Sequence, residues 1–297
     1  MDTLTTLSDG IARLVEGAGP GVVRVEARRH YPGSGIVWST DGVIVSADHL
    51  IEHEEGLAIG LHDGRTVAAS IVGRDSTTDL AVLRIVGVTL TPAPWGTLEG
   101  ARVGQLVLAL ARPGRTVRAT LGVITAFGDN WRTRTGGQID RYLQADARMG
   151  PGFSGGPLVD VTGKVLGLNT RGIRHRTNLT LPVPTIRRVV ETLLSQGRIR
   201  RGYLGIGSQP IPLAASVRQQ LGQDAGLLVF AVAGGSPAER GGVLQGDIIV
   251  TLEGTPSRQH GDLMAVLGGD RVGSPLRVRL VRGGQIQELS LVVGERE

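Results

Sequence analysis

The chain has 297 residues, of which 40% are hydrophobic, and this length is enough for about two packed domains. It contains no cysteine, which excludes disulfides and thiolate metal sites. The formal net charge is +5, but the basic residues are dispersed and not interleaved with aromatic side chains, so we predict no nucleic-acid binding. The 46 glycines and 14 prolines lie between short runs of Val, Ile, Leu and Thr, which indicates many short strands joined by tight turns.

The N-terminal segment has a helical pattern. Apolar residues recur at helical spacing from Leu4 to Val15, which predicts an amphipathic helix over residues 3–16, within an N-terminal unit of residues 1–17. The segment lacks the basic and apolar regions of a secretory leader. No run in the chain approaches the roughly 18 apolar residues that cross a membrane, so we predict no transmembrane segment.

Strand-like segments follow in two groups, divided by a stretch with proline and glycine at residues 90–101. The first group comprises residues 22–27, 42–47, 57–61, 66–73 and 80–86, and the second comprises residues 105–111, 118–127, 139–145, 164–170 and 178–183. Two antiparallel barrels of about six short strands each would use this material, because closing a sheet removes its exposed edges.

A second helical pattern closes this part of the chain. Residues 184–196 place apolar side chains on one helical face behind Pro184, and Gly197 supplies a C-terminal stop. We predict a domain over residues 18–197 and a small α/β domain over residues 198–297. In the latter, strands are predicted at 203–207, 226–232, 247–252, 275–281 and 286–293, and helices at 236–241 and 259–268.

The segment from Gly152 to Pro157 reads GFSGGP and places Ser154 among glycines. Acyl transfer needs a nucleophile on a tight turn whose own N–H, with that of the residue two before it, points at the developing oxyanion. Ser154 and Gly152 suit these roles. The alternative is a glycine-rich β-turn with an incidental serine.

A serine hydroxyl needs a base, and the base needs an orienting carboxylate. His49 follows an apolar strand at residues 43–47, and Asp79 lies where a polar turn enters the next apolar strand. Each residue alone would more often be structural. Their order along the chain, histidine, aspartate and serine, with each at a strand end, predicts a catalytic triad.

Four segments resemble motifs of the HtrA (high-temperature requirement A) family of trypsin-like serine proteases. They run from Gly33 to Val37, from Asp41 to His49, from Thr78 to Leu83 and from Gln144 to Pro157. The resemblance implies a mostly β fold, in which a trypsin-like double six-stranded barrel is followed by a small α/β PDZ domain. It also implies His49 as general base and acid, Asp79 as the residue that orients it, and Ser154 as the nucleophile.

The same resemblance implies a substrate-binding region at Met149, Thr170, Arg171 and Gly172, where the substrate backbone would add as a β-strand and Thr170 would also bond to Asp79. The alternative is an ordinary barrel strand and hairpin.

The chain departs from the family at three positions near the serine. Phe153 stands where the family usually has Asn, and Arg148 and Gly150 also differ. If Arg148 reached the floor of the specificity pocket, it would favour acidic substrate segments together with Arg171 and Arg174.

Residues Tyr203, Leu204, Gly205 and Ile206 resemble the carboxylate-binding loop of a PDZ domain. The helix around Leu263 and Leu267 would form the other wall of a peptide groove. The alternative is a small α/β unit that only packs on the first domain.

Two functions follow from these predictions. The first is an endopeptidase that cleaves unfolded or misfolded proteins, with a PDZ domain that binds peptide C-termini. The second is a weakly proteolytic chaperone or peptide-binding scaffold, because Phe153 could impair the oxyanion turn. No cofactor or metal site is predicted.

The resemblance also implies a homo-oligomer, with a trimer favoured, whose contacts the N-terminal helix could supply or block. The compartment is undetermined. The chain as written indicates the bacterial cytoplasm, and a removed leader would place it in the cell envelope or periplasm.

Overall fold

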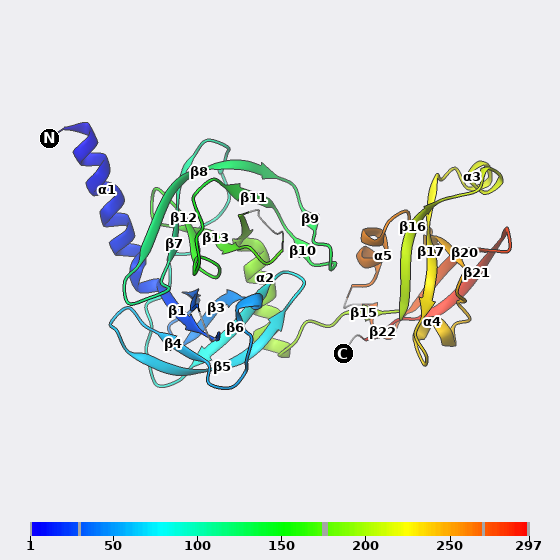
Figure 1. Ribbon diagram of the computed structural model, residues 1–297, viewed down its shortest axis with the longest axis horizontal. Helices are drawn as coiled ribbons and strands as arrows, with labels where there is room; N and C mark the ends of the chain where they lie inside the picture. Colours follow the sequence, from blue (N-terminus) through cyan, green and yellow to red (C-terminus); the bar gives the residue numbers. More distant parts are fainter. Residues whose placement is uncertain (1, 29–30, 174–177, 269–270, 296–297) are drawn as a thin grey trace. The chain divides into compact units, whose positions relative to one another are not determined.

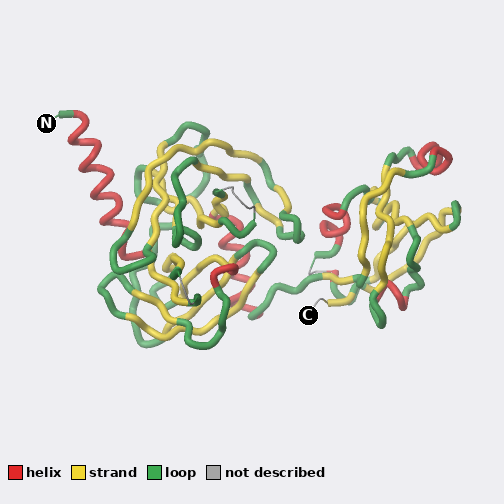
Figure 2. The backbone as a smooth tube through the Cα atoms, viewed as in Figure 1, coloured by secondary structure: helices red, strands yellow, loops and turns green. Residues whose placement is uncertain are grey.

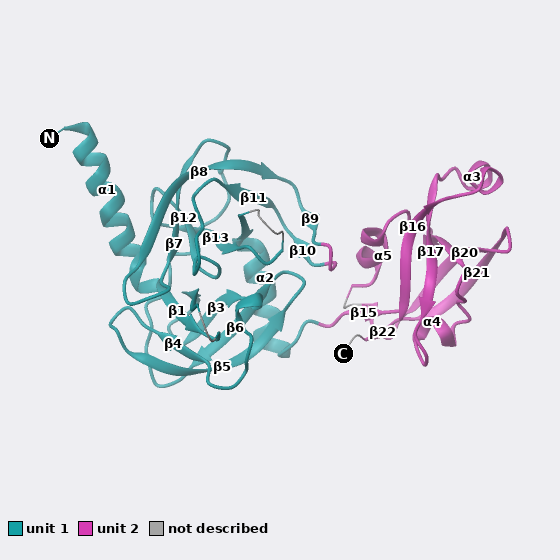
Figure 3. Cartoon of the chain, in the orientation of Figure 1, with its two compact units in different colours: residues 1–133, 137–199 teal, residues 134–136, 200–297 magenta. Residues whose placement is uncertain are grey.

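The computed structural model describes residues 2–28, 31–173, 178–268 and 271–295 (Figures 1 and 2). Strands dominate, as predicted. The chain divides into two compact units, one of residues 1–133 and 137–199 and the other of residues 134–136 and 200–297 (Figure 3).

Helix α1 (Thr3–Ala18) begins at the predicted residue, ends two residues later than predicted, and continues into a short 3-10 turn, η1 (Gly19–Gly21). One side of α1 and strands of the second barrel line an apolar cleft of about 520 Å³. Leu7 lines this cleft and is 53% exposed, whereas Leu4 is 72% exposed and does not line it.

The first barrel is closed and consists of antiparallel strands in the order β1-β2-β3-β6-β5-β4. Its strands are β1 (Val22–Glu26), β2 (Gly33–Val37), β3 (Val43–Ala47), β4 (Ala58–Gly60), β5 (Thr66–Asp75) and β6 (Leu80–Ile85). A further 3-10 turn, η2 (Asp48–Leu50), follows β3.

The second barrel is also closed, in the order β11-β14-β13-β12-β7-β8. Its strands are β7 (Leu106–Ala111), β8 (Arg118–Gly128), β11 (Tyr142–Ala145), β12 (Pro157–Asp160), β13 (Val165–Thr170) and β14 (Leu179–Pro182). A hairpin of β9 (Trp131–Arg132) and β10 (Gln138–Ile139) precedes β11. The prediction of two six-stranded barrels is therefore confirmed.

The sequence patterns missed three strands of the first unit, β2, β9 and β12. The prediction of one strand over 139–145 was wrong, because the chain turns between β10 and β11. Glycines weakened the strand pattern of β2. A Cβ on Gly33 would lie 2.3 Å from Leu50 Cδ1, and one on Gly35 would lie 2.9 Å from Ile44 Cγ2, so close packing requires residues of low strand propensity there.

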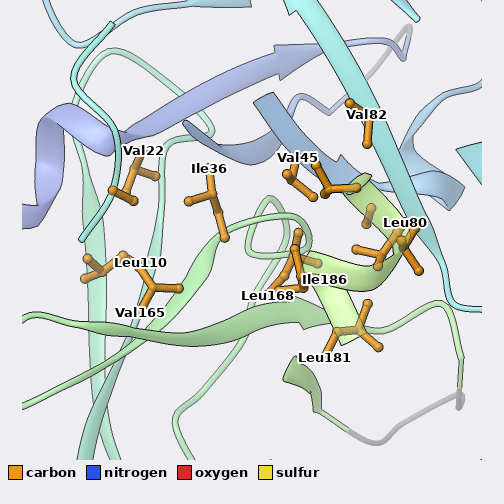
Figure 4. Packing of buried hydrophobic residues seen from close by; sticks show 14 of the residues in the cluster. Val22, Ile36, Val45, Leu80, Val82, Leu110, Val165, Leu168, Leu181 and Ile186 are labelled. Atoms are coloured by element: carbon orange, nitrogen blue, oxygen red, sulfur yellow. The ribbon is translucent and has the colours of Figure 1, made fainter. Parts of the chain in front are cut away.

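The two barrels share one apolar core, which helix α2 (Val183–Gln196) completes (Figure 4). Gly197 ends α2 in the left-handed conformation, as its position predicted. Ile36 of the first barrel, Leu168 of the second and Ile186 of α2 are all fully buried in this core. Residues from both barrels are thereby fixed relative to each other.

The second unit contains a six-stranded sheet. Five of its strands follow the order β16-β17-β18-β20-β21, and the short strand β19 pairs with β18, while β15 and β22 form a separate pair. Its strands are β15 (Gly202–Tyr203), β16 (Ile206–Pro212), β17 (Ala225–Val232), β18 (Ile248–Leu252), β19 (Thr255–Pro256), β20 (Pro275–Arg282), β21 (Gln285–Val292) and β22 (Gly294–Glu295). Its helices are α3 (Ala215–Leu221), α4 (Pro237–Arg240) and α5 (His260–Val266).

The prediction of a strand over 203–207 was wrong, and helix α3 was not predicted. Gly205 has a φ of +80°, so the chain breaks after Tyr203 and the main strand, β16, begins at Ile206. The path places β16 at the edge of the sheet, where it pairs with β17 alone among the described strands.

Candidate active site

His49 and Asp79 meet because neighbouring strands deliver them to one edge of the first barrel. Ala47, the last residue of β3, pairs with Leu80, the first residue of β6. His49 Nδ1 lies 2.8 Å from Asp79 Oδ2 and 2.9 Å from Oδ1. The backbone N–H of His49 also donates to Asp79 Oδ1, at 2.8 Å. With Nδ1 held by the carboxylate, the free ring nitrogen is Nε2.

The second barrel supplies a further donor to the same carboxylate. Thr170, the last residue of β13, is 1% exposed, and its hydroxyl donates to Asp79 Oδ2. That hydroxyl accepts the N–H of Gly172, at 2.9 Å. Asp79 is only 5% exposed, and a buried carboxylate is stable when several donors surround it.

Gly152 belongs to a tight turn just before Ser154. The N–H of Phe153 donates to the Gly150 carbonyl at 3.3 Å, Pro151 is the second residue of this turn, and Gly152, the third, has a φ of +88°. Proline followed by a residue with positive φ defines a type II turn. A Cβ on Gly152 would lie 2.4 Å from Pro113 Cβ, so the position requires glycine for conformation and for space.

Ser154 lies against the first barrel. Its carbonyl accepts the N–H of Ser34 on β2, at 3.0 Å. Strand β2 pairs with β3, and Ser46 of β3 stands three residues before His49. A Cβ on Gly155 would lie only 2.7 Å from Ser46 Oγ. The nucleophile candidate of the second barrel therefore adjoins the strand that leads to His49.

Phe153 is not an obstacle on the surface of the turn. Its side chain is 5% exposed and packs in the core of the second barrel, in one cluster with Met149 and Leu166. Met149, predicted to bind substrate, therefore also has its side chain in this core.

The basic residues predicted near the substrate differ in position. Arg148 is exposed, and its carbonyl accepts the Thr120 hydroxyl at 3.0 Å, so its exposed side chain gives no support to a charged pocket floor. Arg171 and Gly172 are exposed directly after β13, where the substrate strand was predicted. Arg174 lies outside the described residues.

The predicted peptide groove lies in the second unit, beside the sheet edge. Leu204, Leu263 and Leu267 are buried in one core cluster that Ile206 joins. The Leu204 carbonyl accepts the N–H of Ala238 at 2.9 Å, and the Gly205 carbonyl accepts the N–H of Ala233 at 2.8 Å. Because a peptide unit is planar and trans, the N–H groups of Gly205 and Ile206 point the opposite way.

Over the described part of the chain, no three His, Asp or Glu side chains gather as a metal site would require. The helices described there include none that is both long and apolar enough to span a membrane.

Comparison with known proteins identifies both units. Residues 33–168 match the family model of the trypsin-like peptidase domain, and residues 202–293 match that of the PDZ domain. The serine endoprotease DegS of Haemophilus influenzae is 30% identical over 275 residues, which are 89% of this chain and 77% of that relative. The chain belongs to the HtrA family.

Other HtrA relatives agree. A probable periplasmic DegP-like serine endoprotease of Chlamydia trachomatis is 33% identical over 91% of this chain, which spans only 55% of that relative. The solved serine endoprotease of Yersinia pestis is 30% identical with a TM-score of 0.76, over 96% of this chain and 98% of its own. The HtrA-type protease AlgW, solved with a decapeptide, is 28% identical with the same TM-score, over 96% and 98%.

The sequence analysis assigned no role to two residues that have contacts at this candidate site. In the sequence, Ser34 was noted only as one residue of the Gly33–Val37 motif. In the structure, its hydroxyl donates to the Gly152 carbonyl at 2.7 Å. Arg112 donates its backbone N–H to Ser34 Oγ at 2.8 Å. The glycines on both sides of Ser34 could have indicated close packing at this position, whereas nothing in the sequence marked Arg112.

The contacts of Gly172 generate a prediction. A Cβ at this position would lie 2.5 Å from Asp79 Oδ2 and 2.6 Å from His49 Nδ1, so Gly172→Ala must displace one of these groups. We expect the rate of Ser154 labelling by a fluorophosphonate to fall by about 10² or more, because misplaced catalytic groups lose roughly that factor. Gly114→Ala, where a Cβ meets nothing within 4 Å, is the matched control. Equal labelling of both variants would contradict this geometry.

Proposed function

We propose that this chain is a serine endopeptidase that cleaves unfolded or misfolded proteins through a Ser-His-Asp acyl-enzyme mechanism. The observation that carries the proposal is the bonding of His49 Nδ1 to Asp79, at 2.8 Å. Ser154 adjoins this pair, because its carbonyl accepts the N–H of Ser34 on β2, which pairs with the strand that leads to His49. Membership of the HtrA family supports the same activity.

The proposed mechanism assigns one role to each residue. His49 Nε2 takes the proton from the Ser154 hydroxyl as its oxygen attacks the scissile carbonyl. Asp79 fixes the ring through Nδ1 and stabilises the imidazolium that forms. The N–H groups of Gly152 and Ser154 donate to the oxyanion of the tetrahedral intermediate.

The reaction then proceeds by return of the proton. His49 gives it to the leaving amine, the peptide bond breaks, and the acyl group stays on Ser154 until water, activated by the same imidazole, releases it. Backbone pairing of the substrate with Thr170, Arg171 and Gly172 requires an extended segment without partners of its own. Folded proteins rarely offer one, which supports unfolded chains as substrates.

The runner-up function is a peptide-binding scaffold or chaperone with little proteolysis. Its premise was that Phe153 impairs the oxyanion turn. The burial of Phe153 in the second barrel and the type II turn closed at 3.3 Å argue against that premise. The endopeptidase is therefore the function that we favour.

Replacement of the nucleophile separates the two functions. We expect Ser154→Ala to lose casein cleavage and fluorophosphonate labelling, with a fall in kcat of about 10⁶, because no other group can form the acyl-enzyme. Thr185→Val is the control. It removes a hydroxyl at the start of α2 that bonds to Asp140, so this variant should cleave at the wild-type rate. A wild-type protein that binds casein without cleaving it would favour the scaffold.

The PDZ domain is proposed to bind peptide C-termini for substrate capture or regulation. A terminal carboxylate would accept the outward N–H groups of the loop at Gly205 and Ile206, and the peptide would extend the sheet along the free edge of β16. Helix α5, which carries Leu263 and ends just before Leu267, would form the second wall. The HtrA-type protease AlgW, which was solved together with a decapeptide, supports peptide binding by a relative of this chain.

The carboxylate contribution can be measured with matched peptides. A peptide ending in an apolar residue with a free carboxylate should bind about tenfold to a hundredfold more tightly than its C-terminal amide, since hydrogen bonds to a charged group contribute about 1.5–3 kcal/mol. Calorimetry with the full-length Ser154→Ala protein avoids cleavage during the titration. Equal affinities would contradict carboxylate recognition.

We propose that the chain acts in the bacterial cell envelope as a homo-oligomer, with a trimer favoured. The periplasmic names of several relatives support the envelope, and nothing among the comparisons supports the cytoplasm. The apolar cleft beside α1 supports self-association through that helix, because open apolar surface of this kind marks contact sites.

The assembly proposal predicts different effects for two leucines of α1. Leu7→Asp places a charge in the cleft and should convert the oligomer to monomers in analytical ultracentrifugation. Leu4→Asp changes the same helix outside the cleft and should leave the oligomer intact. Loss of assembly in both variants, or in neither, would argue against contacts through the cleft.

A further inference from the structure

Ser34 holds the turn before Ser154 from the opposite barrel, through both its side chain and its main chain. It is fully buried on β2. Its N–H donates to the Ser154 carbonyl at 3.0 Å, and its hydroxyl donates to the Gly152 carbonyl at 2.7 Å. One residue of the first barrel thus contacts both residues of the second barrel that carry the proposed oxyanion donors.

The direction of the hydroxyl bond is determined by its neighbours. Ser34 Oγ accepts the backbone N–H of Arg112 at 2.8 Å, and a carbonyl oxygen can only accept. The proton of Ser34 Oγ is therefore committed to Gly152. Ser34 is itself held, because its carbonyl accepts the Ser46 hydroxyl at 2.8 Å.

Apart from the buried side chain of Phe153 at its end, the turn has little of its own to fix it. It closes through a single backbone bond of 3.3 Å from Phe153 to Gly150. Gly152 has no side chain, and glycine adopts positive and negative φ with similar ease. The contacts that hold Gly152 are the Ser34 hydroxyl on its carbonyl and Pro113 packed against its Cα face.

Arg112 connects this arrangement to the segment that leaves α1. It directly follows β7, is 5% exposed, and donates from its guanidinium to the carbonyls of Gly19, at 2.9 Å, and Val22, at 2.6 Å. A third bond, of 2.7 Å, runs to the Arg115 carbonyl. Burial, with the nearby charge of Arg24, lowers the pKa of Arg112. These acceptors are carbonyl dipoles, so displacement of residues 19–22 would leave a buried cation with too few partners.

We propose that Ser34 is a positioning residue of the oxyanion turn and that Arg112 makes this positioning depend on the segment between α1 and β1. The inference rests on the proposed endopeptidase function. It adds a regulatory route, because a partner or a second copy that pulls on α1 acts on residues 19–22, which Arg112 and Ser34 connect to Gly152.

The test separates transition-state binding from substrate binding. For Ser34→Ala, kcat on a short amidated peptide should fall about tenfold to a hundredfold, less than the roughly 10²–10³ lost with an oxyanion donor. Affinity for a peptidyl boronic acid, whose adduct with Ser154 resembles the tetrahedral intermediate, should fall by the same factor. Binding of the uncleaved peptide, measured in the Ser154→Ala background with and without Ser34→Ala, should change by less than about twofold.

Thr185→Val is the matched control for the loss of a buried hydroxyl. Thr185 is fully buried, and its hydroxyl accepts the N–H of Asp140 at 2.8 Å and donates to the Asp140 carboxylate at 2.7 Å. Both variants lose one accepted and one donated bond, so thermal stability should fall similarly in both. Thermal unfolding can be measured by the fluorescence of the protein's three tryptophans, Trp38, Trp95 and Trp131, which all lie in the first unit. Of these two variants, only Ser34→Ala should lose kcat and boronate affinity together.

Arg112→Met tests the second half of the proposal, and it keeps the proposal testable if Ser34→Ala does not fold. Methionine removes the buried charge while retaining the backbone N–H to Ser34, and it should lower kcat and boronate affinity with unchanged substrate binding. Wild-type values in Ser34→Ala, or the same values as in Thr185→Val, would overturn the role of Ser34. Wild-type values in Arg112→Met would overturn the link to α1. An inactive wild type would overturn the proposed function and this inference together.

Discussion

One apolar core spans the two barrels, and the site between them depends on how that core fixes one barrel against the other. Ile36 and Val45 enter it from the first barrel, Leu168 and Leu181 from the second, and Ile186 from α2. Burial of this apolar surface is non-directional, so it holds the barrels together without specifying the alignment of individual atoms. Close packing restricts their relative positions to a small range.

Finer alignment comes from hydroxyl groups that cross between the barrels in both directions. Thr170 of the second barrel donates to the Asp79 carboxylate of the first, and Ser34 of the first donates to the Gly152 carbonyl of the second. Thr170, Asp79 and Ser34 are buried, so an unmade bond would leave their polar atoms away from water without a partner. Such bonds are directional, and each one fixes a group next to the proposed reaction centre.

In the proposed function, the two units use sheet edges in a similar way. The exposed residues after β13 and the free edge of β16 each offer backbone groups to an extended peptide. The protease unit would read the interior of an unfolded chain, and the PDZ unit its terminus. The second unit has its own core, which Leu204, Leu263 and Leu267 help to form.

The sequence by itself determined the strand content, the helix at α2 with its stop at Gly197, and the three residues of the proposed triad. These follow from local periodicity and from residue types that only certain chemistry requires. It did not reveal β2 as a strand, because the glycines that close packing demands lower strand propensity. Nor did it assign Ser34 or Arg112, whose partners stand up to 118 residues away along the chain. The destination of a buried hydroxyl or guanidinium depends on which distant carbonyl the folded chain brings within reach, and only the tertiary structure decides that.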